Sequence, residues 1–170
     1  MGDGKKDNTI QEWKKEHMPT LATNKRARFD YDLLEEFEGG LMLTGAEVKS
    51  AKKGNINLQG AYLTTRDNGL WLRNAHIGKY APAGEQKDYD PTRDRKVLVH
   101  ASEIKKILGK KQSQGLTIVP INVYTKGALV KLSFALARGK RQHEKRESIK
   151  KRDVEKQTRE EMKKTRKIMV

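Results

Sequence analysis

Apolar and polar residues alternate along the central part of the chain, which is typical of strands with one buried face. The first alternating segment starts at residue 29, and Glu35 interrupts its apolar row. One side of this segment carries Phe29, Tyr31, Leu33 and Phe37. A bend or bulge is expected at Gly39-Gly40, because glycine tolerates backbone angles that other residues avoid. Further strands are expected at 61–65, 70–77, 97–99, 116–124 and 128–137.

Turn residues separate these segments. Asp67-Asn68-Gly69 between two apolar runs predicts a tight β-hairpin, and Thr125-Lys126-Gly127 predicts a second one. Pro120 has no N–H to donate to a neighbouring strand, so it is expected at an edge or a bulge. The stretch from 78 to about 95 shows no periodic pattern, and long loops of this kind are often functional or mobile.

Two short helices are indicated. Thr44 and Glu47 have the spacing of a capping box, in which each side chain satisfies a backbone donor of the other residue. This predicts a helix over about 45–53 that ends at Gly54. Ser102 is expected to cap a second helix, which ends at Gly109. The apolar face of that helix consists of Ile104, Ile107 and Leu108.

About six short strands and two or three short helices predict a mainly β fold, a small closed or nearly closed β-barrel. The chain has 170 residues, which suits one domain with extensions. We expect a disordered N-terminal extension at 1–23, a barrel domain at 24–137, and a basic tail at 138–170. The tail has favourable charge pairs four residues apart but no burying stripe. It is therefore expected to be disordered alone and helical against a charged surface.

The charge distribution points to a polyanionic partner. The formal net charge is +15, and the tail from residue 138 carries 14 basic against 6 acidic residues. Such a surface gains affinity for nucleic acid by releasing counterions from the phosphate backbone. Two alternatives remain open at this point, a surface that serves only solubility and a tail that is merely solvated.

Several classes of protein are excluded or disfavoured. The longest uninterrupted apolar run has four residues, Phe134 to Ala137, which excludes a membrane-spanning helix. The chain has no cysteine, so disulfides, thiolate metal sites and cysteine catalysis are absent. These features indicate a cytoplasmic protein.

No catalytic constellation is visible either. The four histidines are scattered without ligand spacing, and no phosphate-binding glycine loop occurs. We therefore expect a protein that is not an enzyme and that uses no metal or cofactor. A metal-dependent nuclease built from distant carboxylates is the remaining enzymatic alternative.

The basic clusters at 24–28, 93–96 and 138–141 are candidate RNA contacts. Arginine can form paired hydrogen bonds with phosphates, and asparagine can form hydrogen bonds with base edges. Tyr80 and Tyr89 in the long loop are candidates for base stacking, with packing against the barrel as the alternative.

The order and spacing of several motifs from about residue 24 to 152 resemble the bacterial SsrA-binding protein family, also called small protein B. The matching segments are N-K-R-A-R at 24–28, F-E-G-G at 37–40, T-G-A-E-V-K-S at 44–50, D-P-T-R-D-R-K at 90–96, A-L-A-R-G-K at 135–140, H-E-K-R at 143–146 and I-K-K-R at 149–152.

This resemblance implies an oligonucleotide-binding-like barrel that binds the tRNA-like domain of transfer-messenger RNA. Members deliver this RNA to stalled ribosomes for trans-translation, in which the nascent peptide is tagged for degradation. The tail is implied to probe the empty mRNA channel and the decoding centre. Elongation factor Tu is the implied companion, and we expect a monomer.

The resemblance also implies the site residues. The RNA-binding set is Asn24, Lys25, Arg28, Glu38, Arg93, Arg95, Lys96, Leu98, Lys131, Arg138, Lys140 and Arg141. The ribosome-contacting set in the tail is His143, Glu144, Lys145, Arg146, Lys150, Lys151 and Arg152. Glu38 is unusual, since a carboxylate near phosphate is unfavourable. It is expected either to accept hydrogen bonds from RNA or to orient a neighbouring cation.

Overall fold

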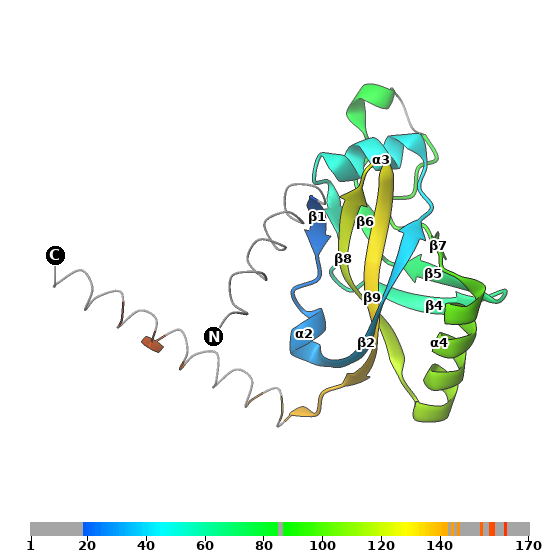
Figure 1. The fold of residues 1–170 in the computed structure, drawn as a ribbon. Helices are drawn as coiled ribbons and strands as arrows, with labels where there is room; N and C mark the ends of the chain where they lie inside the picture. The colour runs from blue at the N-terminus through cyan, green and yellow to red at the C-terminus, as the bar shows by residue number, and fades with distance from the viewer. Residues whose placement is uncertain are drawn as a thin grey trace, which may run out of the picture.

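The computed structural model describes residues 19–84 and 87–142, together with the single positions 144, 146, 154, 157, 158 and 162. Strands dominate these residues (Figure 1). They are β1 (Thr20–Thr23), β2 (Tyr31–Leu41), β3 (Ile56–Asn57), β4 (Tyr62–Arg66), β5 (Gly69–Arg73), β6 (His76–Ile77), β7 (Arg95–Leu98), β8 (Thr117–Lys126) and β9 (Leu129–Gly139). The helices are α2 (Ala27–Asp30), α3 (Gly45–Lys52) and α4 (Ala101–Gln114), with a 3-10 turn, η1, at Ala81–Ala83.

The strands close on themselves. β8 pairs with β4, β4 with β5, β5 with β7, β7 with β2, β2 with β9, and β9 again with β8, all antiparallel. Six strands therefore form a ring, β1 is added along β8, and β3 and β6 form a separate pair. This confirms the predicted mainly β, oligonucleotide-binding-like fold, with three more strands than the estimate of about six.

The interior of the ring is filled by side chains from every strand that forms it. Leu63, Leu72, Val97, Leu132 and Phe134 are all nearly inaccessible to water and belong to one apolar cluster. The rings of Phe37 and Phe134 stack with their centres 5.8 Å apart. Burial of this apolar surface is the main force that stabilises the fold.

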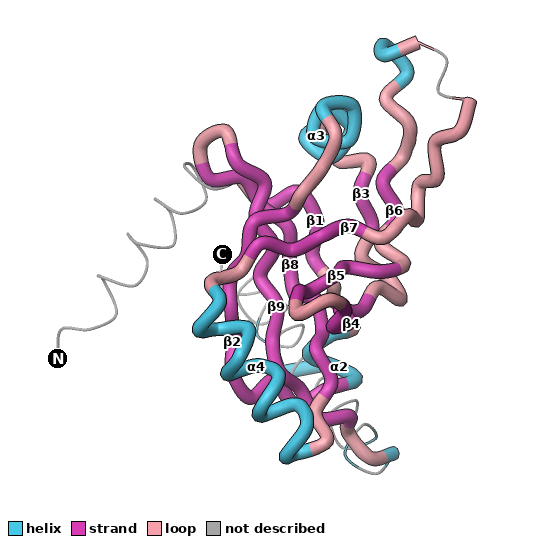
Figure 2. Tube along the Cα trace, turned by 90° about the vertical axis from the view of Figure 1, so that its right-hand side faces the viewer, coloured by secondary structure: helices cyan, strands magenta, loops and turns pink. Residues whose placement is uncertain are grey.

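The helices lie toward opposite ends of the ring (Figure 2). α3 begins with the predicted capping box, since Thr44 Oγ1 accepts from Glu47 N and Glu47 accepts from Thr44 N. α4 inserts the buried side chain of Ile107 into the core. No described helix is long and apolar enough to span a membrane.

The predicted hairpin at 67–69 is confirmed. Asp67 and Asn68 both have positive φ angles, 51° and 53°, and join β4 to β5. Two positive φ angles are the mark of the tight turn that matches the twist of antiparallel strands. Asparagine and aspartate tolerate this conformation better than most residues.

A bulge in β2 corrects the predicted face of the first strand. Leu33 faces Ala137 across the sheet, whereas Glu35 faces Leu136, so Leu34 is an extra residue. Because of this extra residue, odd-numbered side chains before and after Leu34 point to opposite faces of the sheet. Tyr31 and Leu33 pack on a small outer cluster with Ala137, while Phe37 lies in the main core. The interruption of the apolar row at Glu35 marks this bulge.

The predicted bulge near Pro120 is confirmed as well. The register of β8 against β9 shifts between Pro120 and Asn122. Asn24 uses the carbonyl groups of this irregular segment, because its side-chain amide donates to Pro120 O (3.0 Å) and its backbone N–H donates to Ile121 O (2.7 Å).

The second helix differs from its prediction at both ends. α4 is preceded by His100, and no side chain caps its first turn. It runs through Gly109 and ends at Gly115, which adopts the left-handed conformation with φ of 60°. A glycine within a helix costs roughly 1 kcal/mol relative to alanine, and tertiary contacts can override that cost.

The folded body extends beyond both predicted boundaries. β1 at Thr20–Thr23 pairs with β8, so the last residues of the predicted N-terminal extension belong to the sheet. The chain then forms α2 before β2 begins at Tyr31 rather than at Phe29. At the other end, β9 continues to Gly139, and Lys140 N donates to Asp30 O (2.9 Å). The described positions between 142 and 162 are helical, and the expectation that the tail becomes helical only against a charged surface stays a prediction.

Candidate nucleic-acid interface

The outer side of four neighbouring strands carries a continuous band of polar and basic residues, here called the strip. Glu38 of β2 lies opposite Ser133 of β9, and Lys131 of β9 lies opposite Tyr124 of β8. On the other side, Gly40 of β2 lies opposite both Lys131 and Leu98 of β7. Residues that face each other across a sheet point to the same side. The strip consists of Lys96, Leu98, Glu38, Ser133, Lys131 and Tyr124, of which Tyr124 is buried.

The strip faces away from the core because the intervening residues face into it. Val97, Leu132 and Val123 are all members of the buried cluster. Side chains alternate between the two faces of a strand. Figure 1 shows that β8, β9 and β2, which carry most of the strip, lie side by side. The strip therefore forms one surface rather than a set of scattered residues.

Glu38 is held by two neighbours within the strip. Its carboxylate accepts hydrogen bonds from the hydroxyl of Tyr124 and from the ammonium group of Lys131. Burial opposes ionisation of Glu38, but these two hydrogen bonds keep its pKa below the usual range. Burial and the nearby carboxylate raise the pKa of Tyr124. At neutral pH Glu38 is thus charged and Tyr124 keeps its proton.

The β7 side of the strip combines charge with apolar surface. Lys96 is exposed, and Leu98 is 51 % exposed. Met42, which is 52 % exposed, follows the end of β2 and donates its N–H to Lys96 O (3.0 Å). Exposed apolar side chains beside lysines suit a ligand that offers both phosphates and sugar or base surface.

A second group of predicted residues gathers at the opposite end of β2 and β9. Asp32 lies opposite Arg138 there, whereas Lys131 lies at the far end of the same strand pair. Lys140 Nζ donates to Arg28 O (3.0 Å) and lies 3.5 Å from a carboxylate oxygen of Asp32. The exposed basic residues of this group are Lys25, Arg28, Arg138 and Arg141.

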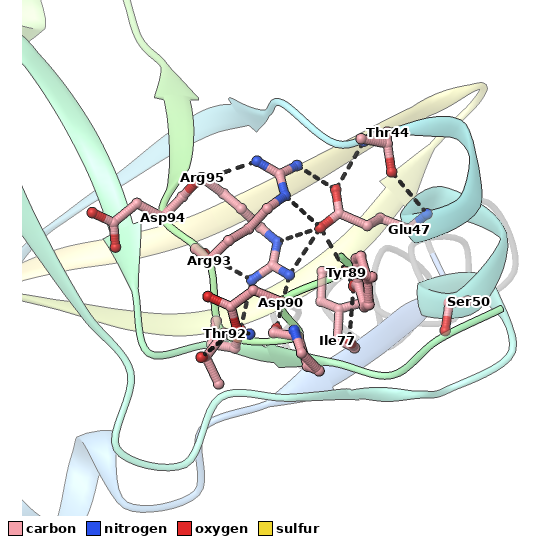
Figure 3. Close-up of polar contacts among 12 residues, drawn as sticks. Thr44, Glu47, Ser50, Ile77, Tyr89, Asp90, Thr92, Arg93, Asp94 and Arg95 are labelled. Carbon is pink, nitrogen blue, oxygen red and sulfur yellow. Dashed lines mark hydrogen bonds and ion pairs between the residues drawn. The ribbon is translucent and has the colours of Figure 1, made fainter. Parts of the chain in front are cut away.

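Arg95 does not belong to the surface. Its side chain has no exposed area, and its donors reach Glu47 Oε1 (2.9 Å), Ala75 O (2.6 Å) and Pro91 O (2.9 Å) (Figure 3). The prediction that Arg95 contacts RNA is therefore corrected. A buried guanidinium requires a counter-charge and acceptors, and Glu47 with these carbonyl groups provides them.

Arg93 is also engaged in this network, although it is partly exposed. It donates from Nε to Glu47 Oε1 (2.9 Å) and from Nη2 to Glu47 Oε2. Burial raises the pKa of Glu47, but the bonds from Arg93 and the backbone of Thr44 outweigh burial, so the pKa lies below its usual range. The network joins α3 to β7 and to the end of the long loop.

The long loop is anchored at both of its ends. Tyr89 donates its hydroxyl to Ile77 O (2.8 Å) within the same network, which makes Tyr89 a packing residue. At the other end, Ser50 Oγ donates to Gly78 O (2.5 Å). Tyr80, the other tyrosine predicted to stack on bases or to pack, lies beside Lys49 and Lys53, whose ammonium groups are 5.7 Å and 4.9 Å from the centre of its ring.

Sequence reasoning missed Tyr124 and Ser133. Both sit in segments whose alternation was recognised, but their outward positions depend on the cross-strand register. The bulge at Ile121 sets that register. A one-residue shift moves every side chain of a strand to the other face, so the pattern alone could not place them.

Most of the predicted ribosome-contacting residues lie outside the described residues. These are His143, Lys145, Lys150, Lys151 and Arg152. Glu144 and Arg146 are described and helical, and Glu144 Oε2 accepts from Arg141 N (2.6 Å). Among the residues described, no group of three or more histidine or acidic side chains could hold a metal ion.

Comparison with known proteins identifies the family. The sequence model of the SmpB protein family matches residues 21–164. The chain belongs to the SmpB family. Two relatives named SsrA-binding protein support this assignment across most of the chain. The one from Trichormus variabilis is 45 % identical over 88 % of this chain and 97 % of its own length. The one from Oleidesulfovibrio alaskensis is 46 % identical over 84 % of this chain and 91 % of its own.

A solved structure also matches this chain. It is described as "tmRNA-SmpB: a journey to the center of the bacterial ribosome". The match has a TM-score of 0.59 and 38 % sequence identity, and it covers 75 % of this chain and 92 % of that chain. The resemblance read from the sequence motifs is thereby confirmed. The SmpB family model extends past the barrel into the tail, so the tail is part of what the family shares.

Proposed function

We propose that the protein binds the tRNA-like domain of transfer-messenger RNA and delivers it to stalled ribosomes for trans-translation. The observation that carries this proposal is the strip, which unites four residues that the family resemblance implied for RNA binding. These are Glu38, Lys96, Leu98 and Lys131, which come from three separate strands. Membership of the SmpB family and the net charge of +15 support the same conclusion.

The side chains in and beside the strip make different kinds of contact with the RNA. Lys96 and Lys131 contact phosphates, which fixes the orientation of the RNA and adds a salt-dependent contribution to affinity. Leu98 of the strip and Met42, which lies beside it, pack against sugar or base surface. Glu38 holds Lys131 rather than contacting phosphate, because a carboxylate and a phosphate repel each other and Lys131 and Tyr124 donate to its oxygens.

The second basic group continues this surface toward the tail. Asn24, Lys25, Arg28, Arg138, Lys140 and Arg141 make up this group. Its exposed cations line the path from the barrel to residue 142. From there the residues at 143–146 and 150–152 contact ribosomal RNA in the decoding centre and the mRNA channel.

The protein acts in the cytoplasm as a monomer beside elongation factor Tu, without catalysing a reaction. Stalled ribosomes and their rescue RNA are cytoplasmic, which sets the compartment. Delivery of an RNA requires binding and release but no bond cleavage. Incubating labelled transfer-messenger RNA with the protein and Mg²⁺ tests this last point, because a nuclease would shorten the RNA.

A competition assay tests the proposed function. Purified protein is mixed with labelled tRNA-like domain and with an excess of bulk tRNA or duplex DNA at moderate salt. We expect the specific complex to persist in the presence of the competitor. Lys131→Ala is expected to weaken binding about tenfold, because the variant loses a phosphate contact and Glu38 loses its cationic partner. Lys105→Ala, on an exposed part of α4, serves as the matched control.

Equal competition by bulk tRNA and DNA would show a general basic nucleic-acid binder instead. In that case, the salt dependence would be similarly steep for every nucleic acid tested. Unchanged binding of Lys131→Ala, with a normal melting temperature, would remove the strip as the recognition surface.

A further inference from the structure

The solvent side of α3 carries a group of lysines that the strip does not include. Glu47, Ser50 and Ala51 form the buried side of this helix. The opposite side carries exposed lysines, and a further exposed lysine precedes Tyr80. The α3 lysine surface consists of Lys49, Lys52, Lys53 and Lys79 together with Tyr80.

Tyr80 lies among these lysines. The ammonium groups of Lys49 and Lys53 are 5.7 Å and 4.9 Å from the centre of its ring. The neighbouring Gly78 is fixed from both sides, since its carbonyl accepts from Ser50 Oγ (2.5 Å) and its N–H donates to Asn55 O (2.8 Å). The ring is thus held beside α3, only two residues from an anchored position.

α3 carries more lysines than stabilisation of its C-terminus requires. A cation near a helix C-terminus contributes about 0.3–1 kcal/mol, and one lysine in the last turn would supply it. Lys49, Lys52 and Lys53 instead place like charges on one side of two turns, where they repel one another. A polyanion would relieve that repulsion. The ring of Tyr80 limits the motion of two lysine side chains, so less rotamer entropy is lost on binding.

The α3 lysine surface lies at the strip's end of the molecule. Figure 1 shows α3 at the end of the sheet where β2 finishes and β9 begins. Lys131 belongs to this end, and Gly139 lies eight residues farther along β9, roughly 26 Å away at the usual rise of a strand. The Arg93–Glu47 and Arg95–Glu47 pairs fasten α3 to β7, which carries Lys96 and Leu98.

We propose that the α3 lysine surface extends the strip and binds the phosphate backbone of the same tRNA-like RNA domain. Its lysines contact phosphates, and Tyr80 holds Lys49 and Lys53 in position for that contact. This inference rests on the proposed function. RNA on the strip continues over α3, while the opposite end of β9 leads to the tail.

A pair of charge-removing double variants tests the contact. Lys49→Gln/Lys53→Gln is compared with Lys105→Gln/Lys111→Gln, which removes two lysines from another helix. Affinity for the tRNA-like domain is measured over a range of salt concentrations. The α3 pair is expected to bind about tenfold more weakly, with a salt slope lower by between one and two. The α4 pair is expected to change affinity less than twofold.

Two single variants test the role of Tyr80. Tyr80→Leu removes the ring, and we expect severalfold weaker binding with an unchanged salt slope, because the phosphate contacts remain but their lysines are no longer held. Tyr80→Phe keeps the ring face and is expected to bind like the wild type. A purely structural role would lower the melting temperature of the leucine variant without this difference in RNA affinity.

The outcomes separate the two proposals. If the wild type does not bind the tRNA-like domain selectively, the proposed function fails. If Lys131→Ala weakens binding but the α3 double variant does not, only the inference about α3 is overturned. It is also overturned if the α3 variant binds the RNA normally and loses affinity for ribosomal subunits alone. That result would assign the surface to ribosomal RNA.

Discussion

Glu38 puts a negative charge into the middle of a basic surface, and its neighbours explain why this is tolerated. Tyr124 and Lys131 both donate to its carboxylate, so the negative charge is balanced locally by protein donors. Of the two roles expected from the sequence, orienting a cation therefore fits the geometry better than accepting hydrogen bonds from RNA.

A double-variant cycle tests this role. Glu38→Gln is expected to weaken binding of the tRNA-like domain severalfold in the wild-type background, because the ammonium group of Lys131 loses its charged partner. In a Lys131→Gln background the same change is expected to have little further effect, since the two residues act together. Binding titrations of the four proteins give the coupling. Equal losses in both backgrounds would indicate a direct contact between Glu38 and the RNA.

The buried Glu47 is expected to control stability rather than RNA contact. Glu47→Gln leaves Arg95 buried without a charged partner and is expected to cost about 3–5 kcal/mol in the free energy of unfolding. The folded-state pKa of Glu47 lies below its unfolded value, so its contribution is present above about pH 4.5. The contribution is lost as the pH falls through the folded pKa. Urea titrations at several pH values measure both effects.

Glu35→Gln serves as the control for this measurement. Glu35 also has a lowered pKa, caused by hydrogen bonds from Lys106 and Lys110, but its contacts lie at the surface. A small change in stability is expected for this variant. A similar loss for both variants would contradict a special role of the buried network.

At the scale of the elements, the sequence predicted those features that depend on interactions between residues close together in the chain. The capping box of Thr44 and Glu47 and the turn at Asp67-Asn68 depend only on residues close in sequence, and both were confirmed. β1 was missed because its four residues have little pattern of their own and are ordered by pairing with β8. Arg95 was misplaced for a related reason, since its partner Glu47 lies 48 residues away.

Helix α4 allows a paired test of the glycine assignment. Gly109 lies inside the helix, and a Cβ built there meets no atom within 4 Å. Gly109→Ala is therefore expected to stabilise the protein by about 0.5–1 kcal/mol. Gly115 has φ of 60°, so Gly115→Ala is expected to destabilise by about 1 kcal/mol. Thermal unfolding measures the change in melting temperature of each variant. Equal shifts in melting temperature for the two variants would place the helix end at Gly109 after all.

At the scale of the whole molecule, the positions of the two ends of β9 set where the tail can be separated from the barrel. Ala137 and Arg138 pair with β2, and Lys140 contacts α2 and the start of β2. A cut after Ala137, the predicted boundary, would remove the contacts of Arg138 and Lys140. A chain that ends at Arg141 keeps all of them, together with every proposed contact of the barrel with RNA.

This truncation tests whether the protein has two separable RNA-binding parts. The chain ending at Arg141 is expected to bind the tRNA-like domain within about threefold of the full chain, because the strip is intact and only distant tail charges are lost. Peptide tagging on stalled ribosomes in a reconstituted translation system is expected to be abolished, since the residues proposed to contact the ribosome are gone. If binding and tagging fell together while the barrel kept its melting temperature, the tail would belong to a single continuous RNA surface. The roughly 26 Å between Lys131 and Gly139 favours two separable parts, because the strip lies far from the residue at which the tail begins.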